Sequence, residues 1–363
     1  MQTRSPKRVA VSRASREELR RRRRSFAALV GLAVLIIVML VLLLGGGDDP
    51  LTSAPTTPES PPGSGPSELL ALSVTGSGHA LLAVVGAGGS QQPAAMVLPP
   101  SMQVVVPGQG EASTDTLRSL SGDSMRIALS NAIGAWAERF AVTDLKHLGD
   151  VVDSIGGLSI DLPSVYTVGS TVMGPGRTTF SGSELVTFLY VDADDEAERW
   201  RLALESLLRE GSTFAPDDFT ESDDAPGAVS LLAMARDTDV IVPQTQVVAG
   251  TVLVPQQPEF DTMVQALFGT TPPVRALVQN GNGVPGIGEA VARRLLPEGF
   301  RVVLSQNAET FDHQTTEIAA VEADHQVDAE RAREALGVGT VSVSQVPSNL
   351  ADITIVVGKD FTG

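Results

Sequence analysis

The most pronounced feature of the hydrophobic pattern is an unbroken apolar run near the start of the chain. Phe26 to Leu44 is nineteen residues long and contains no charged or polar side chain. A helix of this length is about 28 Å long, close to the roughly 30 Å hydrocarbon core of a membrane. A cleaved signal peptide has a shorter apolar region that ends in a small-residue cleavage site, whereas Leu44 is followed by Gly-Gly-Gly-Asp-Asp. The pattern predicts an uncleaved signal anchor, a single transmembrane helix over residues 26–44.

Residues 45–66 interrupt the apolar pattern completely. The segment consists mainly of Gly, Pro, Ser and Thr and has almost no large apolar side chain. Such a composition cannot build a core, because it has too little apolar surface to offset the loss of chain entropy. We predict that residues 45–66 form a disordered linker between the membrane helix and the folded part of the chain.

From residue 67 to residue 269, short apolar runs alternate with segments of helical periodicity. Runs with the length of buried strands lie at 80–87, 94–99 and 101–107. Helical spacing is present at 124–140 and at 196–209, and residues 145–166 are typical of a helix, a Gly-Gly turn and a strand. The mixture predicts an α/β domain over residues 67–269.

A second boundary falls at Thr270-Thr271-Pro272-Pro273, and a further domain is predicted at 273–361. Its expected strands are 274–280, 300–306, 340–346 and 353–358, and its expected helices are 287–296 and 327–336. The predicted fold class is therefore α/β, with a single N-terminal transmembrane helix followed by two extracytoplasmic α/β domains.

The charge distribution sets the predicted orientation. The net charge is −17, yet residues 1–24 carry ten Lys or Arg and two Glu, and everything after Arg24 carries 16 basic and 41 acidic residues. The basic tail of residues 1–25 is predicted to be cytoplasmic by the positive-inside rule, which puts the bulk of the chain outside the cell membrane. The acidic remainder argues against nucleic acid as a partner, since phosphate contact needs clustered cations. The chain has no cysteine, so disulfides and thiolate sites are excluded.

Two motifs suggest ligand chemistry. Gly281-Asn282-Gly283-Val284-Pro285-Gly286 has the G-x-G-x-x-G form of a dinucleotide site, but the acid expected about 20 residues further on is missing. We therefore favour a strand-to-helix turn that needs glycine conformations. The acidic run Asp192 to Glu196 lacks the EF-hand pattern and is predicted to be a solvated loop before a helix. The four histidines show no close ligand spacing, and zinc-site and nucleophile-elbow motifs are absent, so we predict no metal site and no catalytic residue.

The C-terminal segment closely resembles the LytR C-terminal domain of bacterial envelope proteins. The resemblance covers Val274 to Phe361 and rests on Asn280-Gly281, Gly283-Val284-Pro285-Gly286, Gly299-Phe300 and Ala351-Asp352. Upstream, His147 to Pro163 and Phe180 to Val191 look like the later half of a LytR-CpsA-Psr domain, as does the helix around Trp200. The order of tail, anchor, linker and two domains is similar to that family too.

The resemblance implies transfer of glycopolymers from a polyprenyl-pyrophosphate carrier to peptidoglycan, with arginines on the pyrophosphate and acids on Mg²⁺. Here the residues that the family uses are degenerate. The early Asp-Thr is replaced near Gly78-His79, Pro-Arg-Asp appears as Pro99-Pro100-Ser101, and the arginines after Tyr-Val are replaced by Asp192 and Asp194. Only Arg199, with Arg201 nearby, matches the later Arg-x-x-Arg-Gln element.

These departures favour a non-catalytic, membrane-anchored LytR-CpsA-Psr relative that binds envelope glycopolymer, a polyprenyl-linked lipid carrier or an envelope protein, with no cofactor. The alternative is an active phosphotransferase that moves glycopolymer from polyprenyl pyrophosphate to peptidoglycan with Mg²⁺. In that alternative Arg199, Arg201 and Arg177 hold the pyrophosphate. A third function, transcriptional regulation, is suggested by the family's name and has only the arginine tail in its favour.

Overall fold

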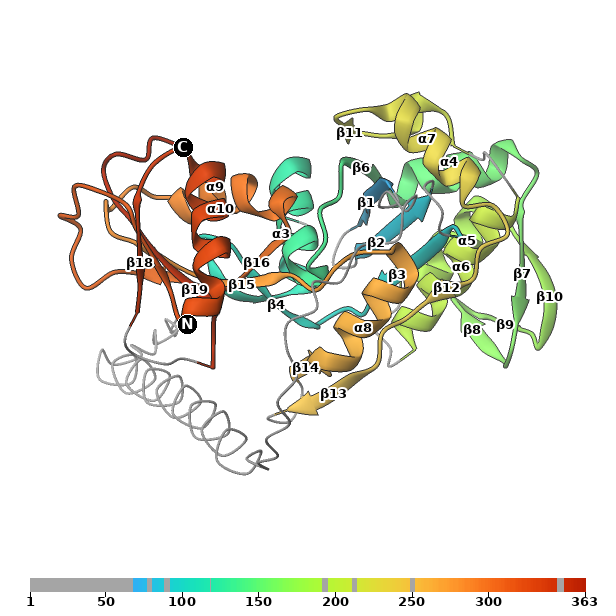
Figure 1. Ribbon diagram of the computed structural model, residues 1–363. Coiled ribbons are helices and arrows are strands. Elements are labelled where there is room, and N and C mark those ends of the chain that lie inside the picture. Colours follow the sequence, from blue (N-terminus) through green and yellow to red (C-terminus); the bar gives the residue numbers. More distant parts are fainter. Residues whose placement is uncertain are drawn as a thin grey trace, which may run out of the picture. The chain divides into compact units, whose positions relative to one another are not determined.

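The structure is a computed structural model of the chain (Figure 1). It describes residues 68–76, 80–87, 92–117, 119–190, 195–210, 214–248, 252–344 and 349–363. The predicted membrane helix and linker lie outside the described residues. Among the described residues, no helix is long and apolar enough to cross a membrane. The described residues belong to one compact unit, and they include two β-sheets of more than two strands.

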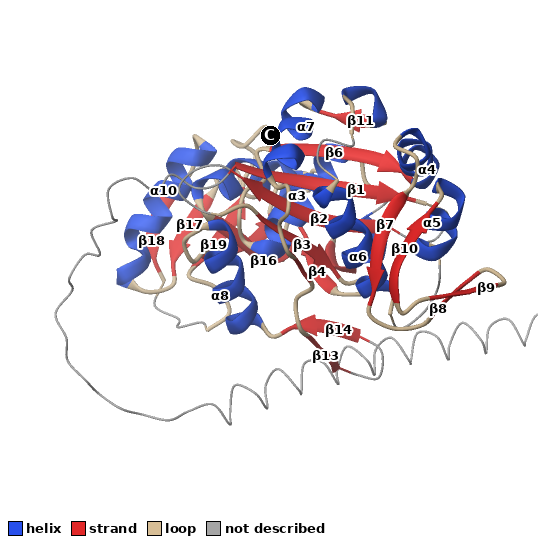
Figure 2. Ribbon diagram, turned by 90° about the vertical axis from the view of Figure 1, so that its right-hand side faces the viewer, coloured by secondary structure: helices blue, strands red, loops and turns tan. Residues whose placement is uncertain are grey.

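The first sheet has six strands in the order β11-β6-β1-β2-β3-β12. Its strands are β1 (Glu68–Thr75), β2 (Ala80–Ala87), β3 (Ala94–Leu98), β6 (Arg139–Asp144), β11 (Glu221–Ser222) and β12 (Val240–Ile241). Strand β1 runs antiparallel to β2 and parallel to β6, and Figure 2 shows β6, β1, β2 and β3 side by side. The expected strands at 80–87 and 94–99 are thus confirmed.

Helices cover both faces of this sheet, as the side chains of β1 illustrate. Its side chains alternate between two cores, so that Leu70 and Leu72 enter one while Leu69 and Ala71 enter the other. The first core is closed by the helices α4 (Leu145–Ser154), α5 (Gly182–Leu189), α6 (Glu196–Arg209) and α7 (Ala225–Met234). The second is closed by α3 (Gly122–Ile133) and α8 (Gln257–Phe268). Strand β1 is apolar on both faces because both faces are buried.

Short hairpins and turns surround this three-layer arrangement. The hairpins pair β4 (Gln103–Val106) with β5 (Gly110–Ser113), β7 (Leu158–Leu162) with β10 (Gly176–Phe180), β8 (Tyr166–Val168) with β9 (Thr171–Met173), and β13 (Thr245–Val248) with β14 (Val252–Pro255). Two single turns, α2 (Thr114–Leu117) and the 3-10 helix η1 (Pro216–Asp218), complete the first domain, by which we mean residues 68–268.

The second sheet, in the C-terminal domain, has five strands in the order β16-β15-β19-β17-β18. Its elements are β15 (Val274–Asn280), α9 (Ile287–Leu295), η2 (Leu296–Glu298), β16 (Phe300–Asn307), β17 (Glu317–Ala320), η3 (Ala323–His325), α10 (Gln326–Leu336), β18 (Thr340–Val343) and β19 (Ile353–Val357). Every element that the sequence predicted after residue 273 is present. Strand β17 was missed, since it is four residues long and starts with an exposed glutamate.

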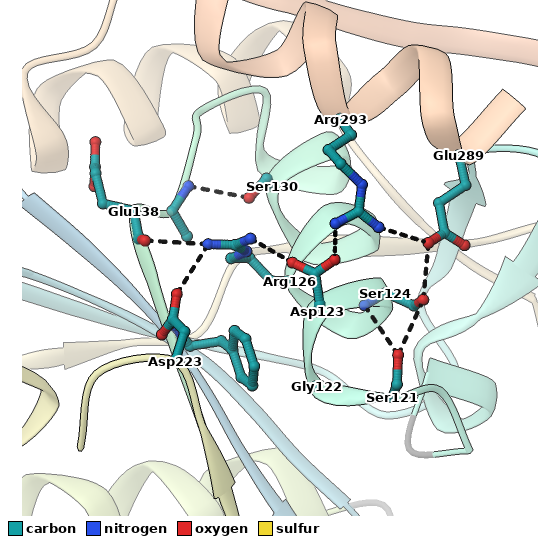
Figure 3. Close-up of polar contacts among 12 residues, drawn as sticks. Ser121, Gly122, Asp123, Ser124, Arg126, Ser130, Glu138, Asp223, Glu289 and Arg293 are labelled. Carbon is teal, nitrogen blue, oxygen red and sulfur yellow. Dashed lines mark hydrogen bonds and ion pairs between the residues drawn. The ribbon is translucent and has the colours of Figure 1, made fainter. Parts of the chain in front are cut away.

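Helix α3 belongs to both domains. Its Met125, Ala128 and Leu129 pack in the second core of the first domain, whereas Ile127 packs in the core of the C-terminal domain. On the polar side, Figure 3 shows Asp123 between Arg126 of its own helix and Arg293 of α9. Ser124 Oγ also donates to Glu289 Oε1 at 2.9 Å. A helix that packs into both domains in this way fixes them against each other.

Asn131 adds the most specific contact between the domains. Its Nδ2 donates to the carbonyl oxygens of Val302 and Val105, both at 2.9 Å, and its Oδ1 accepts the Val302 N–H at 2.7 Å. Val302 lies on β16, the edge strand of the C-terminal sheet. The amide therefore satisfies both backbone groups that a further strand would otherwise pair.

The predicted C-terminal end of one helix is wrong. The helix expected at 124–140 ends at Ile133, because Gly134 adopts a left-handed conformation with φ of 69° and caps it. Phe140 lies in β6 instead of a helix. A side chain at Gly134 would also collide with the Arg301 guanidinium, whose Nη2 lies 2.3 Å from the ideal Cβ position. The glycine that ends the helix is thus also a contact point for the C-terminal domain.

We predict that Asn131→Ala lowers the free energy of unfolding by about 3 kcal/mol, because it leaves buried backbone groups of Val302 and Val105 without partners. Urea denaturation of the full-length protein in detergent, followed by tryptophan fluorescence, measures the change. Asn307→Ala is the matched control, since Asn307 is exposed at the end of the same strand β16. Equal stability of both variants would contradict the role given to Asn131.

Candidate functional site

A cavity of about 590 Å³ opens where the parallel strands β1 and β6 end. Thr75 and Asp144 are register partners at these strand ends, and helices α4 and α5 supply the other walls. The lining residues of this strand-end cavity are Thr75, Gly76, Asp144, Leu145, Lys146, Gly149, Asp150, Asp153, Gly182, Ser183, Val186 and Tyr190. Carboxyl ends of parallel strands are a usual position for ligand sites in α/β folds.

Asp144 occupies the N-terminus of α4. Its Oδ1 accepts the backbone N–H of His147 and its Oδ2 contacts His147 Nδ1, each at 2.8 Å. Burial alone would raise the pKa of Asp144, but the hydrogen bonds from His147 outweigh it and hold the pKa below its usual value. The N-terminus of this helix is therefore already neutralised by an ionised carboxylate of the chain itself.

The N-terminus of α5 is occupied in the same way. Ser181 and Glu184 form a capping box, in which Glu184 Oε2 accepts the Ser181 N–H at 2.9 Å. Those hydrogen bonds lower the pKa of Glu184. From the neighbouring helix, Asp153 Oδ1 accepts the Gly182 N–H at 2.7 Å. Helix N-termini usually attract anions because their N–H groups are free, and here carboxylates of the chain take these N–H groups.

Helices α4 and α5 touch at glycines, which sets the width of the cavity. A Cβ added at Gly182 would lie 2.1 Å from the Gly149 carbonyl oxygen, whereas one added at Gly149 would lie 3.3 Å from the Gly182 carbonyl oxygen. The backbones thus approach as closely as two glycines allow. This contact also brings Asp153 of α4 within reach of the first N–H of α5.

The lining of the strand-end cavity is negatively charged. Asp144, Asp150 and Asp153 contribute three carboxylates, and Lys146 Nζ pairs with Asp150 Oδ2 at 2.7 Å. This pairing raises the pKa of Lys146. Oxygen-rich walls accept hydrogen bonds from hydroxyl or ammonium groups and repel phosphates. Within the described residues, no group of three or more His, Asp or Glu side chains is placed to hold a metal ion.

Arg199, the best sequence match to the pyrophosphate-binding arginines, is buried in the core of the first domain. It is 5% exposed, and its guanidinium lies over the rings of Tyr166 and Phe188, each at 4.9 Å. Nε donates to Asp195 Oδ1 at 2.9 Å and Nη1 to the Phe188 carbonyl at 3.2 Å. The aromatic rings, a carboxylate and a backbone carbonyl occupy the sides of the cation.

Arg201 and Arg177 lie in different surroundings from Arg199. Arg201 is two residues further along α6 and donates twice to Glu198, at 2.7 Å each, and once to Glu205. The hydrogen bonds with Glu198 raise the pKa of Arg201. Arg177 is exposed on β10, where Asp161 is its register partner across the hairpin. The three arginines predicted from the sequence therefore do not share one environment.

The acids that the sequence singled out are only partly described. Asp192 and Asp194, like Gly78 and His79, lie outside the described residues. Asp195 precedes α6 as predicted, but its carboxylate binds Arg199 instead of capping the helix. The acids that line the strand-end cavity were not identified from the sequence. Their signal was present, since Asp150 and Asp153 are three residues apart on one helix beside Gly149.

The glycine motif after β15 is the strand-to-helix turn that the sequence favoured. Gly283 and Gly286 have φ of 76° and 80°, and α9 starts directly after Gly286. The β4–β5 turn of the first domain packs closely against the first turn of α9. A Cβ added at Gly288 would lie only 2.7 Å from the Gly108 Cα. Gly108 N–H also donates to Ser305 Oγ at 2.9 Å. These glycines serve chain reversal and domain contact.

Asp352 joins two strands of the C-terminal sheet. Its carboxylate accepts the Arg275 backbone N–H at 2.8 Å and binds the Arg275 guanidinium, with Nη2 at 2.6 Å from Oδ1. Burial would raise the pKa of Asp352, but the contacts with Arg275 outweigh it and lower the pKa. This pair explains the Ala351-Asp352 element on which the resemblance partly rests.

A protein-family model, described as LytR cell envelope-related transcriptional attenuator, matches residues 274–361. These residues form a LytR C-terminal domain. The match begins at the first residue of β15 and ends after β19, so the LytR C-terminal domain comprises the whole second sheet and its two helices. No curated protein matches the chain in sequence.

Solved structures similar to this chain include LytR-CpsA-Psr proteins, each aligned over 56% of the chain. For Bacillus subtilis TagV the identity is 12%, the TM-score is 0.47 and 98% of that chain is covered. For B. subtilis TagT the values are 15%, 0.46 and 92%. A structure of YwtF (TagT), described as a LytR-CPS2A-psr family protein with bound octaprenyl pyrophosphate lipid, has 15% identity, a TM-score of 0.45 and 91% coverage.

We predict that Gly182→Ala lowers the free energy of unfolding by about 3 kcal/mol, because its Cβ meets a backbone oxygen that cannot rotate away. Gly149→Ala should cost clearly less, since the nearest atoms to its Cβ lie at 3.3 Å and need to move by only a few tenths of an ångström. Urea denaturation of both variants measures the difference. The reverse order would contradict the glycine contact described between α4 and α5.

We also predict an acid-dependent contribution from Asp352. Its pKa is lowered in the folded state, so its contribution is complete above the unfolded pKa near 4 and is lost as the pH falls through the folded value. Asp352→Asn should therefore destabilise the LytR C-terminal domain by about 1 kcal/mol or more at pH 7 and by less at pH 3. Denaturation at both pH values tests this, and a cost that does not change with pH would contradict it.

Proposed function

We propose that this chain is a membrane-anchored, extracytoplasmic protein of the bacterial cell envelope, a LytR-CpsA-Psr relative that binds envelope glycopolymer without transferring it. The LytR C-terminal domain supports the envelope assignment, and the sequence resemblance over residues 147–163 and 180–191 supports the relationship. The predicted anchor at Phe26 to Leu44 gives the location, with the N-terminus in the cytoplasm.

The observation that carries the non-catalytic part of this proposal is the charge of the strand-end cavity. Three carboxylates line it, and two of them already accept the N–H groups at the N-termini of α4 and α5. A pyrophosphate needs cations or free N–H donors, and a close contact with like charges costs several kcal/mol. Sugar hydroxyls, in contrast, donate hydrogen bonds to carboxylates.

The burial of Arg199 argues against the alternative of an active phosphotransferase. To bind a pyrophosphate, Arg199 would have to leave Asp195 and two aromatic rings, and Arg201 would have to leave Glu198 and Glu205. Removing one partner of such a pair exposes an uncompensated charge and is costly. In the family, Mg²⁺ would accompany the pyrophosphate, so without a bound pyrophosphate we propose no Mg²⁺ cofactor. A polyprenyl-linked carrier is likewise a weaker candidate ligand than the glycan itself.

The test is binding and turnover with a lipid pyrophosphate. We expect the full-length protein in detergent to show no saturable binding of geranylgeranyl pyrophosphate with MgCl₂, by calorimetry, and no transfer from a polyprenyl-pyrophosphate-linked glycan. TagT, whose structure contains octaprenyl pyrophosphate, is the positive control. Mg²⁺-dependent turnover would overturn the proposal and establish the phosphotransferase alternative.

A further inference from the structure

A second cavity, of about 430 Å³, lies between the first domain and the LytR C-terminal domain. We call it the interdomain cleft. Its walls come from β4, β5, α3, β14 and α8 on one side and from β15, β16 and residues 349–350 on the other. Its volume is within the usual range of small-ligand sites, which is about 300–1,000 Å³.

The cleft is held open by the contacts that fix the two domains. Asn131 in its wall bonds to β4 and β16 at once, and Arg301 Nη1 binds Asp261 Oδ1 of α8 at 2.7 Å. Both the Asn131 and Arg301 side chains are more than nine-tenths buried. A site whose walls are joined in this way is formed before any ligand arrives, which lowers the entropic cost of binding.

Strand register turns polar side chains toward the cleft from both domains. Val105 and Glu111 are partners across the β4–β5 hairpin, so Gln103, two residues from Val105, lies on the same face as Glu111. Across the cleft, Arg275 and Arg301 are register partners on β15 and β16. Asp352 and the Asn349 carbonyl hold the Arg275 guanidinium in place, and its contact with Asn349 is 2.8 Å.

The residues that line the cleft suit an uncharged polar ligand. Its charged residues are Arg275, Arg301, Glu111 and Asp261, two of each sign, and the amides Gln103, Gln257 and Asn349 add neutral donors and acceptors. Apolar surface is supplied by Val105, Val254, Pro255 and Leu350. An N-acetylated hexosamine matches these polar and apolar walls, because it carries hydroxyl and acetamido groups beside apolar C–H faces. A phosphate would instead need a net positive lining.

We propose that the interdomain cleft binds one to two residues of an uncharged, N-acetylated envelope saccharide. The inference rests on the proposed function for the class of ligand, and it assigns the ligand to a place that both domains build. The amide side chains bind acetamido and hydroxyl groups, Glu111 accepts hydroxyl donors, and the fixed Arg275 donates to ring or carbonyl oxygens.

The test uses the full-length protein in detergent and N,N′,N″-triacetylchitotriose as the probe, with binding followed by calorimetry. We expect saturable binding, and we expect Gln103→Ala and Glu111→Ala each to raise the Kd by about tenfold, as the loss of one good hydrogen bond does. Gln109→Ala and Glu309→Ala are the matched controls, because both residues are exposed outside the cleft, and they should leave the Kd unchanged.

Three other outcomes would overturn the assignment. Binding that neither cleft variant weakens, but that Asp150→Ala does, would place the saccharide in the strand-end cavity and leave the proposed function intact. Binding that inorganic pyrophosphate displaces would indicate an anion site. The absence of binding by the wild-type protein would contradict both the cleft and the glycan-binding function, whereas the pyrophosphate titration above tests the non-catalytic assignment by itself.

Discussion

One helix shared by two hydrophobic cores is the constraint on which the rest of the described structure depends. Helix α3 contributes Met125, Leu129 and Ile133 to the first domain and Ile127 to the LytR C-terminal domain. Because a buried methylene is worth about 0.8 kcal/mol, neither core can lose α3 cheaply. The two domains therefore do not move independently, and the interdomain cleft is a fixed feature of the folded unit.

Electrostatics determine what the strand-end cavity can accept. In an α/β fold, helix N-termini near the carboxyl ends of parallel strands form a natural anion site. Here Asp144 and Asp153 fill that role intramolecularly, and the same bonds stabilise α4 and α5. At the N-terminus of each of these helices, an N–H donor that a phosphate could use is thus already bonded to a carboxylate of the chain itself.

Much of the fold could be predicted from the sequence, because the signals were local. Helix α6 and strands β2 and β15 lie at the predicted residues, where apolar spacing and flanking Gly or Pro agree. Strand β17 was missed because a four-residue strand has little periodicity. The end of α3 was missed because the helical spacing continues past the cap at Gly134 to Phe140, which instead pairs with Ala71 of β1, far away in sequence. Local patterns do not encode such long-range contacts.

The candidate sites were harder to predict for the same reason. Arg199 was matched by its position in a motif, but its burial between Tyr166 and Phe188 arises from hairpins and helices that are distant in sequence. The interdomain cleft has no sequence motif, because Gln103 and Arg275 line one cavity only through the docking of α3 against β16. Since the same contacts fix the domains and shape the cleft, a ligand that binds there stabilises the docked arrangement by an amount that grows with its concentration relative to its Kd. Domain docking and ligand binding are then one linked equilibrium, in which Asn131 acts on the cleft without touching the ligand.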